Sequence, residues 1–193
     1  AVIDSERALV THELPPEVIR EVLKYSVLAG IHAQIYLDDV VIFEKTSPYA
    51  EHYVSRHRMP YAVDPDIRKK TFFNVPKVLA FAPVERQDEV LAAYRERFSG
   101  IAQVSRSSPG FIEINRLGVT KATALEEVCG MLNISRAQTA ALGDNYLDLE
   151  MIEWAGVGAC VADGAEEVKA AADLIVPACD EDGVAVFIEQ YVL

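Results

Sequence analysis

The sequence predicts an α/β protein made of two parts, and three observations support this. Of its 193 residues, 51 % are hydrophobic, which is enough for one large domain or two small ones. Up to residue 116, most of the expected elements follow the order αββαβαββ. From residue 117 onward, helices alternate with short apolar strands, a pattern typical of a parallel sheet covered by helices on both faces. We therefore expect the architecture to change near residue 117.

The elements of the first part follow from hydrophobic periodicity and turn signals. Two short strands surround a polar turn at residues 4–7, and residues 59–74 form an irregular polar stretch. The other expected elements are a helix from Pro16 to Gly30, strands within 31–45 that turn at Asp38-Asp39, a helix at 48–58, a strand at 77–83, a helix at 85–98, and strands at 101–108 and 111–116.

The second part is expected to alternate helix and strand to its end. Its expected elements are a helix at 120–132, a strand at 139–142, a helix at 147–155, a strand at 157–161, a helix at 165–172, a strand at 174–176 and a helix at 184–191.

Charge and cysteine content narrow the function classes. The formal charge is −12, and the longest basic cluster is Arg68-Lys69-Lys70, which argues against binding to nucleic acid or to anionic membranes. Three cysteines, Cys129, Cys160 and Cys179, lie in apolar surroundings, so we expect buried packing and a reducing, cytoplasmic compartment. The chain opens at Ala1 without a leader, which indicates a processed or excised chain.

Asp144 and Asp148 stand four residues apart directly after the strand expected at 139–142. Ligands of doubly wound sheets collect where parallel strands end and helix N-termini point. If a helix begins near Asn145, the two carboxylates share one face and repel by roughly 0.2–0.5 kcal/mol unless a cation such as Mg²⁺ neutralises them. The alternative is that Asp144 is an N-cap and Asp148 favours the helix dipole.

Lys121 follows Thr120, a natural N-cap, and therefore falls in the first turn of a helix. The helix dipole repels a cation there by roughly 0.3–1 kcal/mol. A phosphate bound beside the helix N-terminus would reverse this penalty. The alternative is a solvated lysine without a ligand.

Two other patterns indicate no site. His52 and His57 are five residues apart, which does not fit helical metal-ligand spacing. The Asp-x-Asp pair in residues 64–70, DPDIRKK, has a proline between the acids, and we interpret it as a solvated loop.

Residues 118–135, GVTKATALEEVCGMLNIS, and 141–184, which begin ALGDNYLDLEM, resemble the Cof-type (IIB) phosphatases of the haloacid dehalogenase superfamily. The resemblance implies a hairpin of the core at 1–13, an α/β cap that selects the substrate at 14–116, and the C-terminal part of a Rossmann-like core at 117–193. It also implies a phosphomonoesterase of small phosphorylated metabolites, such as sugar phosphates, and a Mg²⁺ cofactor.

The same resemblance assigns roles to individual residues. In this family a lysine holds the phosphate and the nucleophilic carboxylate, which implies that role for Lys121. The Gly-Asp-x-x-x-Asp motif binds Mg²⁺, so Asp144 is implied as a ligand and Asp148 as a ligand directly or through water. Many relatives carry Asn where this chain has Leu147, and Asn145 is a substitute near the phosphate. Asp163, in place of the family's Asn, is a second departure at the phosphate site.

The family's nucleophile motif, an apolar strand ending in Asp-x-Asp-Gly-Thr, does not occur in these 193 residues. The resemblance implies that roughly 80 N-terminal residues of an ordinary member are absent. We therefore expect no turnover from this chain alone, because phosphoryl transfer needs a carboxylate nucleophile. The open sheet edge is expected to favour a homodimer or a partner segment that completes the core sheet. The alternative to a phosphomonoesterase is a non-catalytic phosphate-binding or regulatory module. A phosphomutase is the third possible function.

Overall fold

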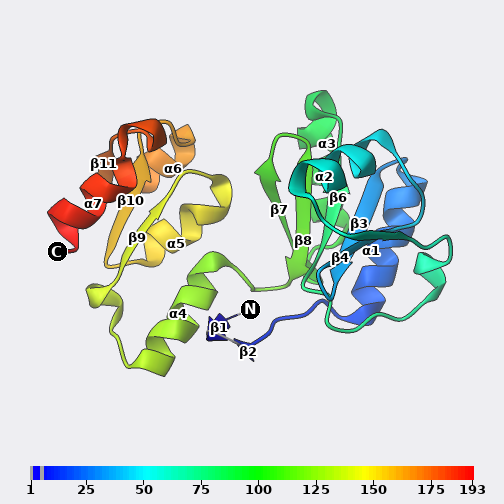
Figure 1. Cartoon of the computed structure of the whole chain (residues 1–193), viewed down its shortest axis with the longest axis horizontal. Helices are drawn as coiled ribbons and strands as arrows, with labels where there is room; N and C mark the ends of the chain where they lie inside the picture. The colour runs from blue at the N-terminus through cyan, green and yellow to red at the C-terminus, as the bar shows by residue number, and fades with distance from the viewer. Residues whose placement is uncertain (1, 5–6) are drawn as a thin grey trace. The chain divides into compact units, whose positions relative to one another are not determined.

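The structure, a computed structural model, describes residues 2–4 and 7–193 (Figure 1). Except near the N-terminus, the chain divides between Gly118 and Val119 into two compact units, residues 3–118 and residues 119–193. We call them unit 1 and unit 2. The two N-terminal strands, β1 (Val2–Asp4) and β2 (Arg7–Val10), pair with each other as predicted, and residues 5–6 of their expected turn lie outside the described residues. No helix among the described residues is long and apolar enough to cross a membrane.

Unit 1 contains a six-stranded sheet in the order β5-β4-β3-β6-β8-β7, in which only β4 and β5 run parallel. Its elements after β2 are α1 (Pro16–Leu28), β3 (His32–Leu37), β4 (Val40–Phe43), α2 (Pro48–His57), β5 (Tyr61–Val63), β6 (Lys77–Phe81), α3 (Gln87–Arg97), β7 (Ala102–Ser108) and β8 (Phe111–Arg116). The hairpin between β3 and β4 turns at Asp38 and Asp39, whose φ angles of 49° and 63° are those that a two-residue turn needs.

The order of elements differs from the predicted αββαβαββ at one place. Strand β5 and a 3-10 turn at Ile67–Lys69 occupy the stretch predicted to be irregular. All three residues of β5 are exposed, so the strand carries no inside-outside alternation that a sequence pattern could reveal. Its hydrogen bonds come from β4, a partner that is distant in sequence.

The two faces of this sheet carry different cores. On one face, α1 and α3 pack their apolar residues against Ile35, Val78 and Ile112. On the other face, α2 contributes Ala50 and Val54 to a smaller cluster with β4. This alternation follows from the two-residue period of the strands.

A buried hydrogen-bond chain links α1 to α3 inside the larger core. The Tyr94 hydroxyl donates to Ser26 Oγ over 2.7 Å, and Ser26 donates to the Val22 carbonyl over 2.7 Å. Tyr94 and Ser26 are both 0 % exposed. Burial raises the pKa of Tyr94 to about 12 against an opposing bond from Ser26, so the hydroxyl stays protonated and donates.

Unit 2 is a parallel three-stranded sheet in the order β11-β10-β9, as the helix-strand alternation predicted. Its elements are α4 (Lys121–Leu132), β9 (Ala140–Gly143), a 3-10 turn (Tyr146–Asp148), α5 (Leu149–Trp154), β10 (Val157–Val161), α6 (Glu166–Ala171), β11 (Leu174–Val176) and α7 (Gly183–Tyr191). Phe187 of α7 packs on one face of the sheet, and Ile152 of α5 and Val168 of α6 pack with Cys160 on the other. Helices therefore cover both faces.

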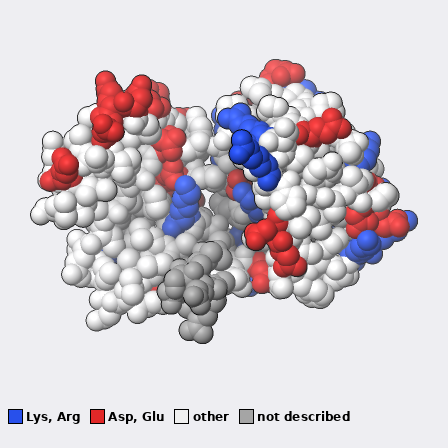
Figure 2. Space-filling view, viewed as in Figure 1, with Lys and Arg blue, Asp and Glu red and all other residues white. Residues whose placement is uncertain are grey.

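Charged side chains are distributed differently over the two units. On the visible face, acidic and basic side chains are interspersed on unit 1, whereas acidic side chains gather over the end of unit 2 where Figure 1 places α6 and the red turn before α7 (Figure 2). Glu166 and Glu167 open that helix, and both are exposed. Their position at a helix N-terminus is the one that the macrodipole favours.

We expect Tyr94→Phe to lower the free energy of unfolding of unit 1 by about 1–1.5 kcal/mol, because the buried Ser26 hydroxyl loses a partner. Hydrogen exchange of the Ile112 amide in a urea titration measures the free energy of unfolding of unit 1. Fluorescence of Trp154, the single tryptophan, measures unit 2 and is expected to be unchanged. Tyr49→Phe, at a tyrosine that is 43 % exposed, is the matched control. An equal effect of both substitutions would contradict the prediction.

Candidate active site in unit 2

The loops that follow β9 and β10 lie side by side at the carboxyl end of the parallel sheet. The amide of Ala165 donates to the Asp144 carbonyl over 2.9 Å and joins the two loops. A Cβ on Gly164 would lie 2.5 Å from Cys160 Sγ and 3.2 Å from the Asp144 Cα, so a residue without a side chain suits this close packing. Carboxyl ends of neighbouring parallel strands are where α/β proteins bind ligands.

Asp148 is the buried centre of this region, with 3 % of its surface exposed. Its Oδ2 accepts hydrogen bonds from the backbone amides of Asp144 at 3.1 Å and Asn145 at 3.0 Å. Its Oδ1 forms an ion pair with Nζ of Lys121 from α4. The Lys121 side chain is 53 % exposed, so the ammonium group also faces solvent. One carboxylate thus connects α4, the end of β9 and the 3-10 turn.

Local sequence explains how Asp148 comes to point inward. Asn145 precedes the 3-10 turn, and the carboxylate three residues later reaches back to the Asn145 amide, as the last residue of a capping box does. A Cβ on Gly143 would lie 2.6 Å from the Asp148 Cγ, so glycine is required there. Thr120 caps α4 as predicted, and this fixes Lys121 at the first position of the helix.

The pKa of Asp148 is lowered below its ordinary value. Burial alone would raise the pKa of this carboxyl, but the hydrogen bond from Lys121, the two backbone amides and the charge of Lys121 together outweigh burial. Asp148 is therefore ionised at neutral pH and keeps Lys121 in place.

Two oxygen donors beside Asp148 fit a hard cation. The Asp144 side chain is exposed, and Oδ1 of Asn145 is buried without a hydrogen-bond partner among the described residues. Mg²⁺ commonly takes one or two protein carboxylates and fills its remaining positions with water and phosphate oxygens. These donors fit such a partial shell, although the described residues contain no group of three His, Cys, Asp or Glu placed to hold a metal.

The predicted site residues therefore lie together, in an arrangement that their spacing did not predict. Asp144 and Asp148 do not share a helix face, because a 3-10 turn separates Asp144 from α5. The interpretation of Asp144 as an N-cap is wrong, since Asn145 precedes the turn. Lys121 is not simply a solvated lysine, since it pairs with a buried acid. The missed signal is Asn145 followed three residues later by an acid, which is a capping pattern.

The structure also places the three cysteines and the two residues that depart from the family's pattern, Leu147 and Asp163. Leu147 lies within the 3-10 turn, half-buried. Asp163 is exposed, and its Oδ1 accepts the amide of Cys179 at 3.0 Å. Cys129 and Cys160 are buried as expected, but Cys179 is exposed, which corrects the expectation of buried packing. The apolar residues before Cys179 end in β11, and the cysteine itself begins a surface 3-10 turn.

A family model described as haloacid dehalogenase-like hydrolase matches residues 1–188. The chain belongs to this family. A 5-amino-6-(5-phospho-D-ribitylamino)uracil phosphatase of Bacillus subtilis, YcsE, is 37 % identical to this HAD-like hydrolase over 107 residues, covering 55 % of this chain and 42 % of the relative. A second phosphatase of that name and organism, YitU, is 27 % identical over 184 residues, covering 92 % of this chain and 67 % of the relative.

Solved structures give the same fold for the HAD-like chain. A haloacid dehalogenase-like hydrolase from Bacteroides thetaiotaomicron superposes with a TM-score of 0.82 at 29 % identity, covering 96 % of this chain and 70 % of that one. The mixed α/β fold predicted from the sequence is thus confirmed. The matched stretch spans less than half of the first B. subtilis relative.

We expect Asp148→Asn to lower the free energy of unfolding of unit 2 by about 1–3 kcal/mol at pH 7, because charge-assisted bonds are lost in a buried site. With a folded-state pKa below the unfolded value, the carboxylate contributes its stability above about pH 4 and loses it as the pH falls through the folded-state pKa. The variant is therefore expected to show a flatter decline in stability below pH 4 in urea titrations of Trp154 fluorescence.

Glu150→Gln is the control for this measurement, because Glu150 is an exposed acid in the first turn of α5. An acid decline of the same steepness in Asp148→Asn and in the unsubstituted chain would show that the Asp148 carboxylate does not carry the pH dependence.

Proposed function

We propose that this chain contributes the phosphate-binding half of a Mg²⁺-dependent phosphomonoesterase. The observation that carries the proposal is the half-exposed Lys121 side chain, whose ammonium pairs with the buried Asp148 at the carboxyl end of a parallel sheet. An ammonium group has three N–H donors, so the bond to Asp148 leaves others for the oxygens of a phosphate. Membership of the hydrolase family and the phosphatases among its relatives point to the same chemistry.

In this proposal the residues of the site have distinct roles. Lys121 binds the phosphate and balances its charge, and Asp148 positions Lys121. Asp144 would hold Mg²⁺, with Asp148 supporting the ion directly or through water, and the buried Asn145 Oδ1 is a donor available near the phosphate. The ion would supply further positive charge at the phosphate oxygens. Phosphoryl transfer itself needs a carboxylate in line with the phosphorus. Asp148 is already committed to Lys121 and two amides, so we assign it no such task.

The substrates we propose are small phosphorylated metabolites, with sugar and sugar-alcohol phosphates as the first class to test. The two B. subtilis relatives are named for a substrate that carries a phosphate on a ribityl chain. We assign unit 1 the part of a cap that selects among such substrates, as the family resemblance implies, and its residues 38–45 and 57–70 offer polar side chains for that choice.

A non-catalytic phosphate-binding module is the second candidate. The observation that favours it is Asp163, an exposed acid on the loop that the Ala165–Asp144 bond joins to the site. Where the resemblance implies a neutral Asn, this carboxylate would oppose the negative charge that builds up on the leaving oxygen, and so would act against turnover. This candidate shares the phosphate-binding step and differs in turnover.

The first test is hydrolysis of p-nitrophenyl phosphate by the 193-residue chain with and without Mg²⁺, with denaturing mass spectrometry to check for a second polypeptide. We expect a single mass and no turnover, because no Asp-x-Asp-Gly-Thr strand is present. Inorganic phosphate is nevertheless expected to bind in calorimetry, about tenfold more weakly in Lys121→Ala.

Lys24→Ala, which removes an exposed lysine of unit 1, is the control and is expected to bind phosphate unchanged. Phosphate binding that is absent, or equal in Lys121→Ala and the unsubstituted chain, would contradict both candidates. Mg²⁺-dependent turnover that Asp144→Ala abolishes would mean that a carboxylate of this chain, or a co-purified segment, acts as nucleophile.

We also propose that unit 2 associates through its uncovered apolar surface. Strand β9 pairs only with β10 among the described residues, so one of its backbone edges carries no strand. Met131 and Leu132 at the end of α4 are 49 % and 63 % exposed, and Ile188 of α7 is 42 % exposed. A second copy or a segment that completes the sheet would cover such surface.

Light scattering coupled to size exclusion tests this association. We expect the apparent mass to rise from monomer towards dimer with concentration, and Leu132→Glu to shift the midpoint to higher concentration. Glu126→Gln, an exposed position on the same helix, is the control. A monomer at all concentrations would contradict the proposal.

A further inference from the structure

Unit 1 contains a cavity that the proposed phosphatase site does not use. Its volume is about 750 Å³, within the range of about 300–1,000 Å³ that is common for small-molecule sites. Its walls come from three segments, residues 27–32, 44–49 and 63–68, and a smaller recess of about 40 Å³ shares lining residues with it, among them His32 and Glu44. All lining residues belong to unit 1.

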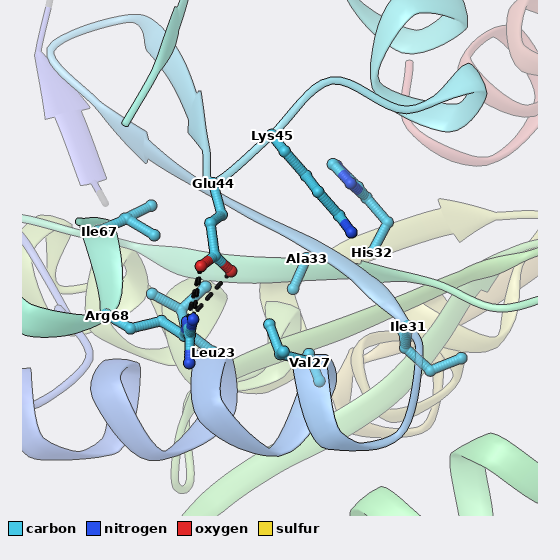
Figure 3. A pocket seen from close by; sticks show the side chains of 10 residues that line it. Leu23, Val27, Ile31, His32, Ala33, Glu44, Lys45, Ile67 and Arg68 are labelled. Carbon is cyan, nitrogen blue, oxygen red and sulfur yellow. Dashed lines mark hydrogen bonds and ion pairs between the residues drawn. The ribbon is translucent and has the colours of Figure 1, made fainter. Parts of the chain in front are cut away.

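The cavity carries one positive charge in excess. Arg68 binds Glu44 in a bidentate pair, with Nε at 3.0 and 3.1 Å from the two oxygens and Nη2 at 2.6 Å from one of them. This pair occupies both oxygens of the Glu44 carboxylate (Figure 3). Lys45 forms no ion pair with any residue that the structure describes. Its ammonium therefore remains available to an anion.

Lys45 and His32 lie next to each other in the cavity wall (Figure 3). Burial lowers the pKa of His32, against an opposing effect of the polar Gln34 side chain, and the charge of Lys45 lowers the pKa further. His32 is therefore neutral at pH 7 and adds no charge. Its Nδ1 lies 3.1 Å from Ser47 Oγ, which ties the ring to the N-cap of α2.

The N-terminus of α2 adds backbone donors to the same wall. Ser47 accepts the amides of Ala50 and Glu51 through its hydroxyl and its carbonyl. The Tyr49 amide donates to no acceptor among the described residues. The helix has ten residues, so its positive dipole end also favours an anion here, although the exposed Glu51 in its first turn offsets part of this effect.

Apolar side chains border the opening. Val27, Tyr49 and Val63 are 45 %, 43 % and 46 % exposed, and all three line this cavity. Three large exposed apolar residues around one cavity fit the apolar body of a ligand, whereas an inorganic ion would leave them in water.

We propose that this cavity binds a small organic anion. Its charged group, a carboxylate or a phosphate, contacts Lys45 and the first turn of α2, and its apolar body packs on Val27, Tyr49 and Val63. The site shares no residue with the phosphate site of unit 2, so the inference does not depend on the proposed phosphatase function.

The test is a titration of the full 193-residue chain with phenylphosphonate, whose carbon–phosphorus bond is not a phosphatase substrate, followed by amide NMR. We expect saturable shifts at Ser47 and Tyr49, and Lys45→Ala is expected to weaken binding at least tenfold. Lys24→Ala, at an exposed lysine of α1, and Lys121→Ala are expected to leave binding at these amides unchanged. Unshifted amides elsewhere in Lys45→Ala verify that the variant folds.

Benzoate and neutral benzyl alcohol serve as comparison ligands in the same titration. Saturable binding of benzoate supports a carboxylate ligand, and binding of phenylphosphonate alone supports a phosphate. A rise in the pKa of His32 on saturation is expected, because a nearby anion favours the imidazolium. Equal binding of neutral benzyl alcohol, no saturable shift at Ser47 and Tyr49, or equal losses in Lys45→Ala and Lys24→Ala would overturn the inference. Loss in Lys121→Ala alone would place the ligand in unit 2 and overturn it too.

Discussion

The buried carboxylate of Asp148 is the interaction on which the arrangement of unit 2 depends. A single side chain accepts two backbone amides from the loop after β9 and pairs with a lysine on α4. A buried charge is stable only when such partners satisfy it, so the positions of all three segments are linked. Gly143 is part of the same constraint, because any side chain there would overlap Asp148.

This constraint explains both what the sequence could reveal about the site and what it could not. The place of Asp144 and Asp148 after an apolar strand was enough to identify them as candidates, and Lys121 was identified as a cation in the first turn of a helix. The four-residue spacing suggested carboxylates on one helix face, which assumes 3.6 residues per turn. A 3-10 turn has three residues per turn, so Asp148 lies over Asn145 and reaches back to its amide.

The fold shows the same division between local and non-local information. Helices such as α1 and α4 were predicted from local signals, which are a proline start with periodic apolar residues in α1 and the Thr120 cap in α4. Strand β5 was missed because pairing with β4, rather than its own pattern, makes it a strand. The cavity of unit 1 has no sequence signature either, since Lys45, Arg68 and Val27 meet only after the sheet has formed.

The two units place a lysine in opposite electrostatic surroundings. Unit 2 binds Lys121 to a buried acid and leaves part of the ammonium in solvent, which fixes its position at the cost of some of its charge. In unit 1, Glu44 pairs with Arg68, and Lys45 has no ion pair within the described part of the chain. In a chain of charge −12 the net charge does not attract an anion, and screening confines the attraction of a single cationic group to a Debye length of about 8–10 Å. Recognition of an anion by this protein must therefore rely on short-range contacts, which is why a lysine beside apolar walls can select an organic anion where the overall charge cannot.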